Sequence, residues 1–334
     1  TMGRAIYKGI LRYLAAVHKC DAVVQPLPVH SVSSMLDVRK KKARLTWQPT
    51  IDVLEETARP TKYIIYISQG ERGYDNGLAV DAKSTAVDID LEPGIMYRFR
   101  ITAVNSGGES FPSEEVCCYL ASEDAPHILL VDGFQRVAGP KAFNTENSSG
   151  FDMNEEPGVV DRKSPEYCGY QHYFGKDGLG KENATGHGYS GSELEGMILA
   201  GNTHDWSCVH AQEILKCGQY NLSSCVASAC PTVNIQHIDI ADIIFGAQMM
   251  DGYSMKPYKT FTPEVRSLME QLTQNGKGVM VSGAHIGTDM PLPEEQQFLK
   301  QTLKWTSNNS VHAAARMNIQ GMNTTAALYT EPNE

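Results

Sequence analysis

Hydrophobic and polar positions follow three different patterns along this 334-residue chain. Apolar side chains recur at helical spacing over residues 1–18, and an extended, proline-containing linker follows over residues 19–30. Over residues 31–122 short runs with a period of two are separated by turn residues, which is typical of β-strands. The five clearest runs are residues 43–49, 61–70, 85–90, 96–105 and 113–121. Short strands at this spacing predict an all-β sandwich.

From residue 123 to 334, apolar strands alternate with amphipathic helices. We predict strands at residues 127–134, 220–225, 241–248, 278–283 and 311–315, and helices at residues 206–218, 262–276 and 293–306. Thr262 is a good helix cap before Pro263, and Asn275-Gly276 is a good helix end. This alternation predicts a doubly wound parallel sheet in an α/β domain, whose ligand crevice lies beyond the carboxyl ends of the strands. The fold class expected is therefore multidomain, with the β-sandwich first and the α/β domain second.

Composition excludes several classes of function. The formal net charge of −10 argues against a surface for nucleic acid or anionic membrane. No apolar stretch reaches the ~18 residues that a membrane span needs. The eight cysteines show no ligand spacing for zinc, so no metal site is expected, and no cofactor is expected either.

The predicted sandwich carries the landmarks of a known domain. Trp47 stands where a buried strand tryptophan is kept, Leu91-x-Pro93-Gly94-x-x-Tyr97 looks like a tyrosine corner, and residues 103–116 look like the last loop and strand. The stretch resembles a fibronectin type III domain over nearly its whole length. That resemblance implies a spacer or protein-binding module, with Trp47 and Tyr97 in the core.

A strand-to-helix turn near the C-terminus has the spacing of a catalytic elbow. Gly283-x-His285-x-Gly287 follows an apolar strand, and in an elbow of this kind the middle residue is the attacking Cys or Ser. The order of elements resembles the class I glutamine amidotransferase-like (flavodoxin-like) fold, with His285 at the cysteine position. Histidine cannot supply the covalent thiolate step. His285 could act as a base, accept a phosphoryl group or cap the next helix, and we favour the cap.

A long insertion, residues 135–205, carries further polar candidates. A serine-hydrolase frame centred on Ser190 has its last glycine one residue early and follows no apolar strand. Further polar side chains lie where the insertion meets the next helix. They could cap that helix, bind a ligand or transfer a proton. The candidate catalytic residues are His285, Asp205, His204 and His210, and the candidate ligand-binding residues are Asp132, Asn202, Asp205, Ser282 and His285.

A wider resemblance covers most of the chain. Residues 131–140, 191–206 and 281–290, together with the fibronectin-like stretch, look like the central and C-terminal part of large Bacteroides-type cell-envelope proteins labelled N-acetylmuramoyl-L-alanine amidase or xanthan lyase. Residues 3–16 resemble the last helix of an amidase domain, which makes residues 1–18 the end of a truncated upstream domain. The resemblance implies a periplasmic, outer-surface or secreted location, a peptidoglycan or polysaccharide partner, and neighbouring domains upstream and downstream.

Three functions remain open. The first is a non-catalytic spacer with a degenerate, glycan-binding α/β module in a peptidoglycan-targeted amidase-like protein. The second is an α/β hydrolase or lyase acting on envelope glycan by His/Asp acid–base chemistry. The third is a purely structural or assembly module.

Overall fold

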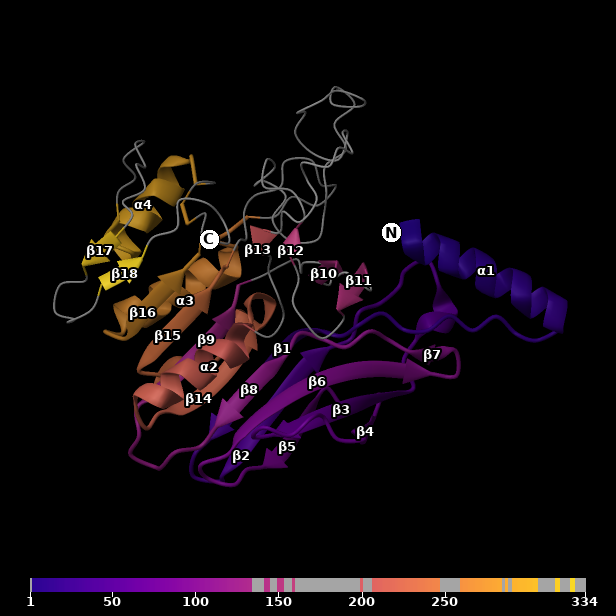
Figure 1. Cartoon of the computed structure of the whole chain (residues 1–334), viewed down its shortest axis with the longest axis horizontal. Helices are drawn as coiled ribbons and strands as arrows, with labels where there is room; N and C mark the ends of the chain where they lie inside the picture. Colours follow the sequence, from indigo (N-terminus) through magenta and orange to yellow (C-terminus); the bar gives the residue numbers. More distant parts are fainter. Residues whose placement is uncertain are drawn as a thin grey trace. The chain divides into compact units, whose positions relative to one another are not determined.

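The computed structural model describes residues 2–133, 141–144, 149–152, 158–159, 199–200, 206–246, 259–283, 286–287, 290–305, 316–318 and 325–327. Figure 1 shows the helices and strands in chain order, and the chain divides into two compact units. The first comprises Thr1–Asp132, Ser207–Asp242 and Gly276–Gly278, and the second comprises Gly133–Trp206, Ile243–Asn275 and Val279–Glu334. The first unit therefore holds the whole sandwich and also part of the segment after residue 122.

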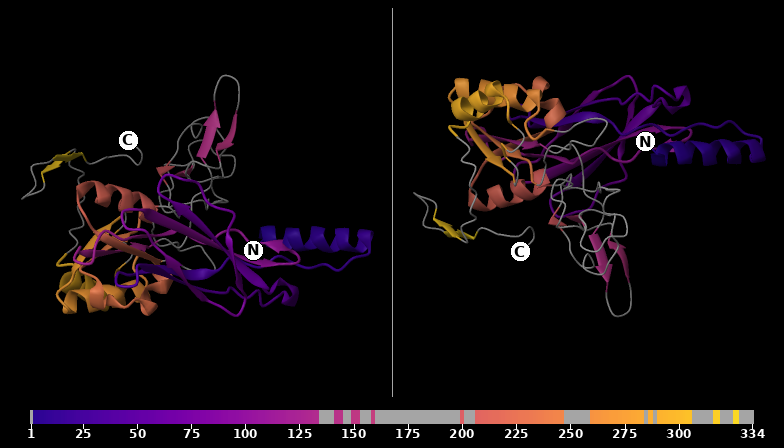
Figure 2. Two further views of the ribbon diagram at one scale, coloured as in Figure 1. Left: turned by 90° about the horizontal axis from the view of Figure 1, so that it is seen from below. Right: turned by 90° about the horizontal axis from the view of Figure 1, so that it is seen from above.

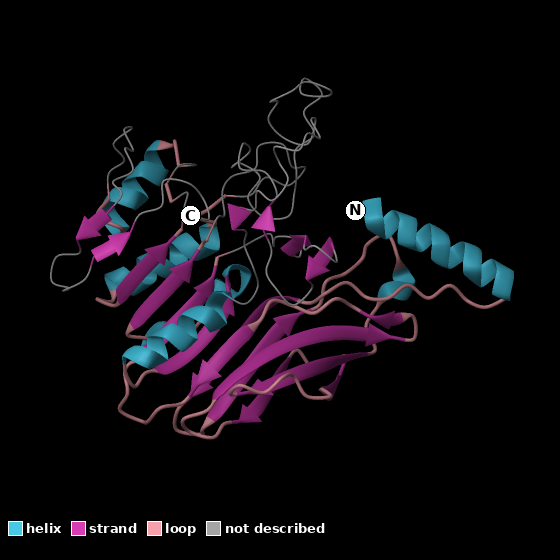
Figure 3. Ribbon diagram, viewed as in Figure 1, coloured by secondary structure: helices cyan, strands magenta, loops and turns pink. Residues whose placement is uncertain are grey.

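The sandwich of the first unit contains eight strands (Figure 3). They are β1 (His30–Asp37), β2 (Lys42–Gln48), β3 (Lys62–Gln69), β4 (Leu78–Asp81), β5 (Ala86–Asp90), β6 (Met96–Asn105), β7 (Gly108–Glu109) and β8 (Val116–Tyr119). The antiparallel order β8-β6-β3-β4 forms one sheet, and β1, β2 and β5 pair in that order on the other side. Each of the five predicted runs contains a strand, which confirms the period-two interpretation.

The core of the sandwich holds both aromatic landmarks. Trp47 is fully buried and packs edge-on against Tyr63, with ring centroids 5.3 Å apart. Tyr97 is 2% exposed, and its hydroxyl accepts a hydrogen bond from the backbone N–H of Glu92 at 3.1 Å. That bond ties the strand to the corner before it, so the predicted tyrosine corner is confirmed.

Helix α1 (Met2–His18) precedes the sandwich, and a 3₁₀ turn, η1 (Glu56–Ala58), follows β2. The segment between α1 and β1 is extended, as predicted, but it is not a free linker. Val24 and Val29 are buried, and the side-chain amide of Asn105 donates to the carbonyl of Val24 at 2.9 Å. The linker is therefore bound along the edge of the sandwich.

Three further elements of the first unit continue the sandwich. They are β9 (His127–Asp132), α2 (Trp206–Cys217, in this unit from Ser207) and β14 (Asn221–Val226). One edge of β14 pairs in parallel with β9 over six residue pairs. Its other edge pairs antiparallel with β8 at Leu222 and with β1 at Ser224 and Cys225. One strand thus covers the open edges of β1 and β8, which would otherwise expose unpaired backbone groups.

Helix α2 covers one face of this added layer. A single hydrophobic cluster joins strand residues of the sandwich to α2, and its buried members are Met96, Cys117, Ile128, Leu130, Cys208, Ala211 and Leu222. The thiol of Cys117, in β8, lies 3.9 Å from the carbonyl of Ser207 at the start of the helix. The sandwich and the β9–α2–β14 layer therefore share one core. After β14 the chain makes two short 3₁₀ turns, η5 (Ala227–Thr232) and η6 (Ile235–His237).

The second unit contains the remaining alternation of strands and helices. Strand β15 (Ile240–Ile244) enters it at Ile243, and α3 (Pro263–Gln274), β16 (Gly278–Ser282) and α4 (Pro293–Thr302) follow. The hydroxyl of Thr262 accepts from the N–H of Val265, and Gly276 has a φ of 68°, so both predicted ends of α3 are confirmed.

Aromatic rings form the centre of this unit. Phe261 makes edge-on contacts with Phe245 and Phe298, at centroid distances of 4.9 and 5.6 Å.

The short strand pairs are β10 (Lys141–Asn144) with β11 (Ser149–Asp152), β12 (Gly158–Val159) with β13 (Leu199–Ala200), and β17 (Arg316–Asn318) with β18 (Thr325–Ala327). The predicted strand at residues 311–315 lies outside the described residues. Among the helices of the described part, none is long and apolar enough to span a membrane.

Candidate functional site

Three of the predicted site residues fall within the described structure. Asp132 is the last residue of β9, Ser282 is the last residue of β16, and His210 lies on α2. The other predicted residues, Asn202, His204, Asp205 and His285, lie outside the described residues. The elbow and the polar cluster before α2 therefore stay predictions.

His210 forms a close pair with an acidic residue on β15. Its Nδ1 atom lies 2.7 Å from Oδ2 of Asp242, across a sequence separation of 32 residues. Because a carboxylate only accepts, Nδ1 is the donor in this pair, and Nε2 is the ring nitrogen that does not bind Asp242. The side chain of His210 is 27% exposed, whereas that of Asp242 is 2% exposed. A buried carboxylate that orients a partly exposed imidazole is an arrangement suited to proton transfer.

Asp242 and Asp132 are both buried carboxylates. Asp242 Oδ1 is buried and has no hydrogen-bond partner among the described residues. Strand alternation places Asp132 on the same face of β9 as Ile128 and Leu130, both of which belong to the core under α2. Asp132 is 2% exposed. His210 on α2 therefore binds one buried carboxylate, Asp242, and strand alternation places a second, the predicted Asp132, on the face of β9 that bears Ile128 and Leu130.

Sequence reasoning missed Asp242. The signal for it was a single acidic residue inside the apolar run Ala241–Phe245, since a buried carboxylate needs a hydrogen-bond donor. The donor, His210, lies 32 residues away in sequence, so no local pattern indicates that the two residues pair.

Ser282 belongs to the second unit. Its side chain is half-buried, and its backbone carbonyl accepts from the N–H of Phe245 at 2.8 Å. Among the described residues, no group of three or more His, Cys, Asp or Glu side chains could hold a metal ion.

The junction between β14 and the sandwich is lined by buried polar side chains. Asn221 is 1% exposed. Its side-chain oxygen Oδ1 accepts from the backbone N–H of Ala121 at 2.8 Å, and its side-chain nitrogen Nδ2 donates to the backbone carbonyls of Ser122 and Ala125 at 2.7 and 3.1 Å. Ser224 accepts from the N–H of Cys117 and donates to the carbonyl of the same residue. These side chains form hydrogen bonds with backbone N–H and C=O groups that strand pairing leaves without a partner.

The opposite face of the same layer holds a buried imidazole. His127, at the start of β9, is 5% exposed, and its Nε2 lies 2.8 Å from the hydroxyl of Ser223. That hydroxyl also accepts from the N–H of Leu36 in β1. Burial lowers the pKa of His127 to about 4, although the nearby carboxylate of Asp239 acts in the other direction. His127 is therefore neutral at pH 7 and serves the junction.

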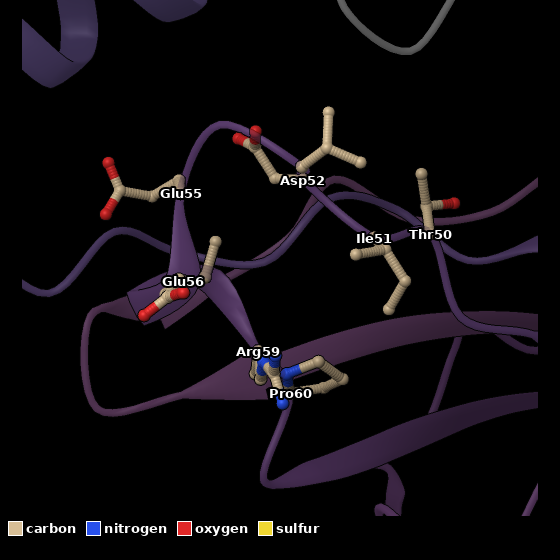
Figure 4. A pocket seen from close by; sticks show the side chains of 9 residues that line it. Thr50, Ile51, Asp52, Glu55, Glu56, Arg59 and Pro60 are labelled. Atoms are coloured by element: carbon tan, nitrogen blue, oxygen red, sulfur yellow. The ribbon is translucent and has the colours of Figure 1, made fainter.

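A pocket of about 240 Å³ lies in the loop after β2, lined by Thr50, Ile51, Asp52, Val53, Glu55, Glu56, Ala58, Arg59 and Pro60 (Figure 4). Figure 4 shows the carboxylates of Asp52 and Glu55 on the side away from Arg59 and Pro60. Both carboxylates are bound by basic side chains of α1. Two of the acidic groups that line this pocket, Asp52 and Glu55, thus serve the contact with α1.

Comparison with known proteins identifies one domain. Residues 27–118 match the family model of the fibronectin type III domain. The match covers β1 to β7 and all but the last residue of β8, with the buried Trp47 and the hydrogen bond of Tyr97, so this part of the chain is a fibronectin type III sandwich.

The individual similarities each cover a minor part of the chain. The mouse (Mus musculus) neuronal cell adhesion molecule is 28% identical over 142 residues, which is 39% of this chain and 11% of that protein. Among solved structures, a fourth fibronectin type III domain of human origin is 23% identical and covers 30% of this chain and 84% of its own, with a TM-score of 0.26. A two-domain segment of chicken tenascin is 22% identical and covers 28% and 49%, with a TM-score of 0.24. The chain spans only a small part of the curated relative.

Proposed function

We propose that this chain is a non-catalytic connecting and ligand-holding region of an exported cell-envelope protein. In this role the fibronectin type III domain is a rigid spacer, and the following strands and helices form a flavodoxin-like, amidotransferase-like module. That module binds peptidoglycan or an envelope polysaccharide without turning it over. The periplasmic, outer-surface or secreted location and the amidase-like parent protein belong to the same proposal.

The observation that carries the proposal is the pairing of β14. A spacer made of independent domains would transmit little orientation, because a flexible linker lets neighbouring domains rotate. Here β14 pairs with β9 on one edge and with two sandwich strands on the other. Within the first unit, the β9–α2–β14 layer of the module is thus joined to the spacer through a shared strand.

A thermal-shift titration of the full chain tests the binding part. Muropeptides, peptidoglycan sugars and acidic polysaccharides would each be added over a range of concentrations. A ligand at 100 times its dissociation constant adds about 2.7 kcal/mol of stability, which raises the midpoint by a few degrees. A saturable shift with one glycan class supports the proposal. If no glycan shifts the midpoint at millimolar concentration, glycan binding by this chain is wrong.

A second function, acid–base catalysis on envelope glycan, is favoured by the pair of His210 and Asp242. General acid–base catalysis needs a side chain that is held in position, and Asp242 holds the ring of His210 through a contact of 2.7 Å. In this alternative Nε2 of His210 would take the proton from a sugar hydroxyl, from water or from the carbon next to a uronic acid carboxylate.

Release of reducing ends or of unsaturated sugars from the same glycans separates the two functions. Catalysis at this pair predicts turnover that falls at least about 100-fold in His210→Ala and in Asp242→Asn. His237→Ala changes an exposed histidine outside the pair and is the matched control. Absence of turnover in the unaltered chain, with glycan binding intact, leaves the non-catalytic function standing.

A further inference from the structure

Two buried thiols meet where α2 packs on the sandwich. In both views of Figure 2 the salmon helix α2 lies along one side of the strands. Cys117 of β8 is fully buried, and Cys208, in the first turn of α2, is 3% exposed. Both belong to the apolar cluster that joins the sandwich to the β9–α2–β14 layer. The two cysteines are roughly 90 positions apart in the sequence, so only the fold brings them together.

The two side chains are in contact. The Cys117 thiol lies 3.9 Å from the carbonyl oxygen of Ser207, which belongs to the peptide bond that leads into Cys208. In standard backbone geometry that oxygen is about 3 Å from the Cα atom of Cys208. The thiols of Cys117 and Cys208 also hydrogen-bond each other. Two thiols in such contact need only a small rotation of their side chains to reach the S–S bonding distance of about 2 Å.

A second pair of buried thiols differs in what it connects. Cys225 ends on β14 and Cys230 lies in the following 3₁₀ turn, and their thiols hydrogen-bond each other as well. These two residues are only five positions apart, so a bond between them would close a very short loop. A crosslink stabilises a fold more when the loop that it closes is longer. The pair of Cys117 and Cys208 closes the longer loop and connects the sandwich to α2.

The surroundings of the pair decide when it reacts. Burial raises the pKa of the Cys208 thiol well above its ordinary value, and the Cys117 thiol and the carboxylate of Glu115 act in the same direction. Because the thiolate is the reacting form, these thiols react slowly once α2 is packed over them. They react readily while α2 is still open, during folding. A bond formed at that stage is then buried, out of reach of reductants.

We propose that Cys117 and Cys208 form a disulfide bond that fixes α2 on the sandwich when the chain folds in an oxidising compartment. The inference rests on the exported location in the proposed function, because disulfides form and persist in exported proteins. The oxidant is a small or protein-borne disulfide, for which glutathione disulfide is the probe. The contact that carries the β9–α2–β14 layer on the spacer thereby becomes covalent.

The reaction is a thiol–disulfide exchange in two steps. The Cys208 thiolate attacks one sulfur of glutathione disulfide, whose S–S bond breaks and releases a glutathione thiolate. The Cys117 thiolate then attacks the Cys208 sulfur of this mixed disulfide, so the bond between the two cysteines forms and a second glutathione thiolate leaves. The two protons of the protein thiols pass to the two glutathione thiolates. The protein loses two electrons, and glutathione disulfide gains them.

Peptide mapping after oxidative refolding tests the proposal on the unaltered full chain. The chain is unfolded in urea with reductant, refolded in a buffer of reduced and oxidised glutathione, alkylated with iodoacetamide and digested with trypsin without reduction. Trypsin releases Cys117 in the peptide of residues 101–136, which also holds Cys118, and Cys208 in the peptide of residues 182–216. We expect most of the chain to yield these two peptides joined by a disulfide. Glutathione adducts at the exposed Cys20 and Cys217 show that the oxidant was active.

Alanine variants identify the two sulfurs. Cys117→Ala and Cys208→Ala should each abolish the link between the peptides. Cys118→Ala is the matched control, because Cys118 is equally buried on the same strand but faces the other side, opposite Tyr97 of β6. This variant should keep the link.

Thermal unfolding measures what the bond contributes. A loop of roughly 90 residues is long, so the chain refolded with oxidant should melt about 5–10 °C above the chain refolded with reductant. Cys118→Ala should show the same difference between its oxidised and reduced forms. In Cys208→Ala the two forms should melt together, and because each variant is compared with itself, any loss of packing cancels.

Three results would overturn the proposal. They are peptides that stay unlinked after oxidative refolding, a link from either peptide to a different cysteine-containing peptide, and a link that persists in Cys117→Ala. The outcome is separate from that of the glycan titration. A linked chain that binds no glycan keeps the disulfide and removes the glycan-binding function, whereas an unlinked chain that binds glycan does the reverse.

Discussion

The fibronectin type III sandwich makes two contacts of opposite character. At α1, the contact includes ion pairs from Arg4, Lys8 and Arg12 to two loop carboxylates, and hydrogen bonds of Arg4 and Tyr7 with the backbone of Gln25. At β14, it consists of strand pairing, a shared apolar core and buried neutral side chains. The first can be weakened by salt and pH, because solvent reaches it. The second resists salt, since its groups exclude water and carry no charge at neutral pH, and it is sensitive to acid only where the buried His127 becomes protonated.

This difference assigns a role to each contact. A shared strand and core make the sandwich and the β9–α2–β14 layer one folding unit. A helix held by ion pairs can detach without unfolding the domain beneath it. The two ends of the sandwich should therefore respond to different perturbations, and the following predictions run from the largest expected effect to the smallest.

Leu222→Ala should destabilise the sandwich and the added layer together. Leu222 is fully buried and belongs to the cluster that joins β9, α2 and β8. A cavity of this kind lowers the free energy of unfolding by about 2–5 kcal/mol. Chemical denaturation followed by fluorescence should show one transition at lower denaturant. Leu54→Ala, on a side chain that is 83% exposed, should change stability by less than about 0.5 kcal/mol.

The junction should lose stability in mild acid because of His127. Burial lowers the pKa of His127 to about 4 from an ordinary value of 6.5. In the unfolded chain His127 therefore binds a proton below pH 6.5, whereas in the folded chain it binds one only below about pH 4. Stability should fall by about 3 kcal/mol across this window.

Urea denaturation between pH 7 and pH 4 measures this effect. His127→Gln keeps a polar side chain but cannot take up the proton, so its pH dependence should be shallower. An equally steep loss of stability in the variant would remove His127 as the cause.

Asn221→Ala should cost less than the core cavity, about 1–3 kcal/mol, because the N–H of Ala121 and the carbonyls of Ser122 and Ala125 lose a buried partner. The thermal midpoint should fall by several degrees. Asn234→Ala removes the exposed cap of η6 instead and is the control, with a smaller shift expected.

The smallest effect should come from Asp52→Asn, below about 1 kcal/mol in global stability. Hydrogen bonds from Lys8 and then Arg4 lower the pKa of Asp52 to about 2 from 3.8. The stabilisation is therefore present above pH 3.8 and is lost as the pH falls toward 2. Faster amide exchange within α1 alone, in Asp52→Asn or in 1 M salt, is the expected result. Asp88→Asn, which removes an exposed pair with Arg44, should leave α1 unchanged.

The same comparison explains what the sequence could predict. Trp47 and Tyr97 stand in local motifs, so the sandwich and its core followed from short-range patterns. The caps of α3 followed from Thr262 and Asn275 for the same reason. Local patterns do not specify which distant strand pairs with which, and nothing near β14 indicated β1 and β8 as its partners. For this reason the sequence did not predict that β14 belongs to the first unit together with the sandwich; it was expected in a separate domain after residue 122.

The candidate site shows the same limit. His210 was named for its chemistry, but its partner Asp242 lies on another element and was missed. The glycan ligand and the vacant elbow at His285 stay predictions. The period of the apolar residues in α1 predicted a helix correctly, whereas only the structure shows that the charged face is the bound one.

Native-state hydrogen exchange of the whole chain tests the central claim most directly, that the sandwich and the β14 layer are one folding unit. The account predicts that amides of β14 at Leu222 and Cys225 exchange with the same opening free energy as those of β6 at Phe99 and Ile101, and that Leu222→Ala lowers all four equally. Exchange in β14 more than about 100-fold faster than in β6, with β6 unaffected by the substitution, would show two independent domains and contradict the rigid connection.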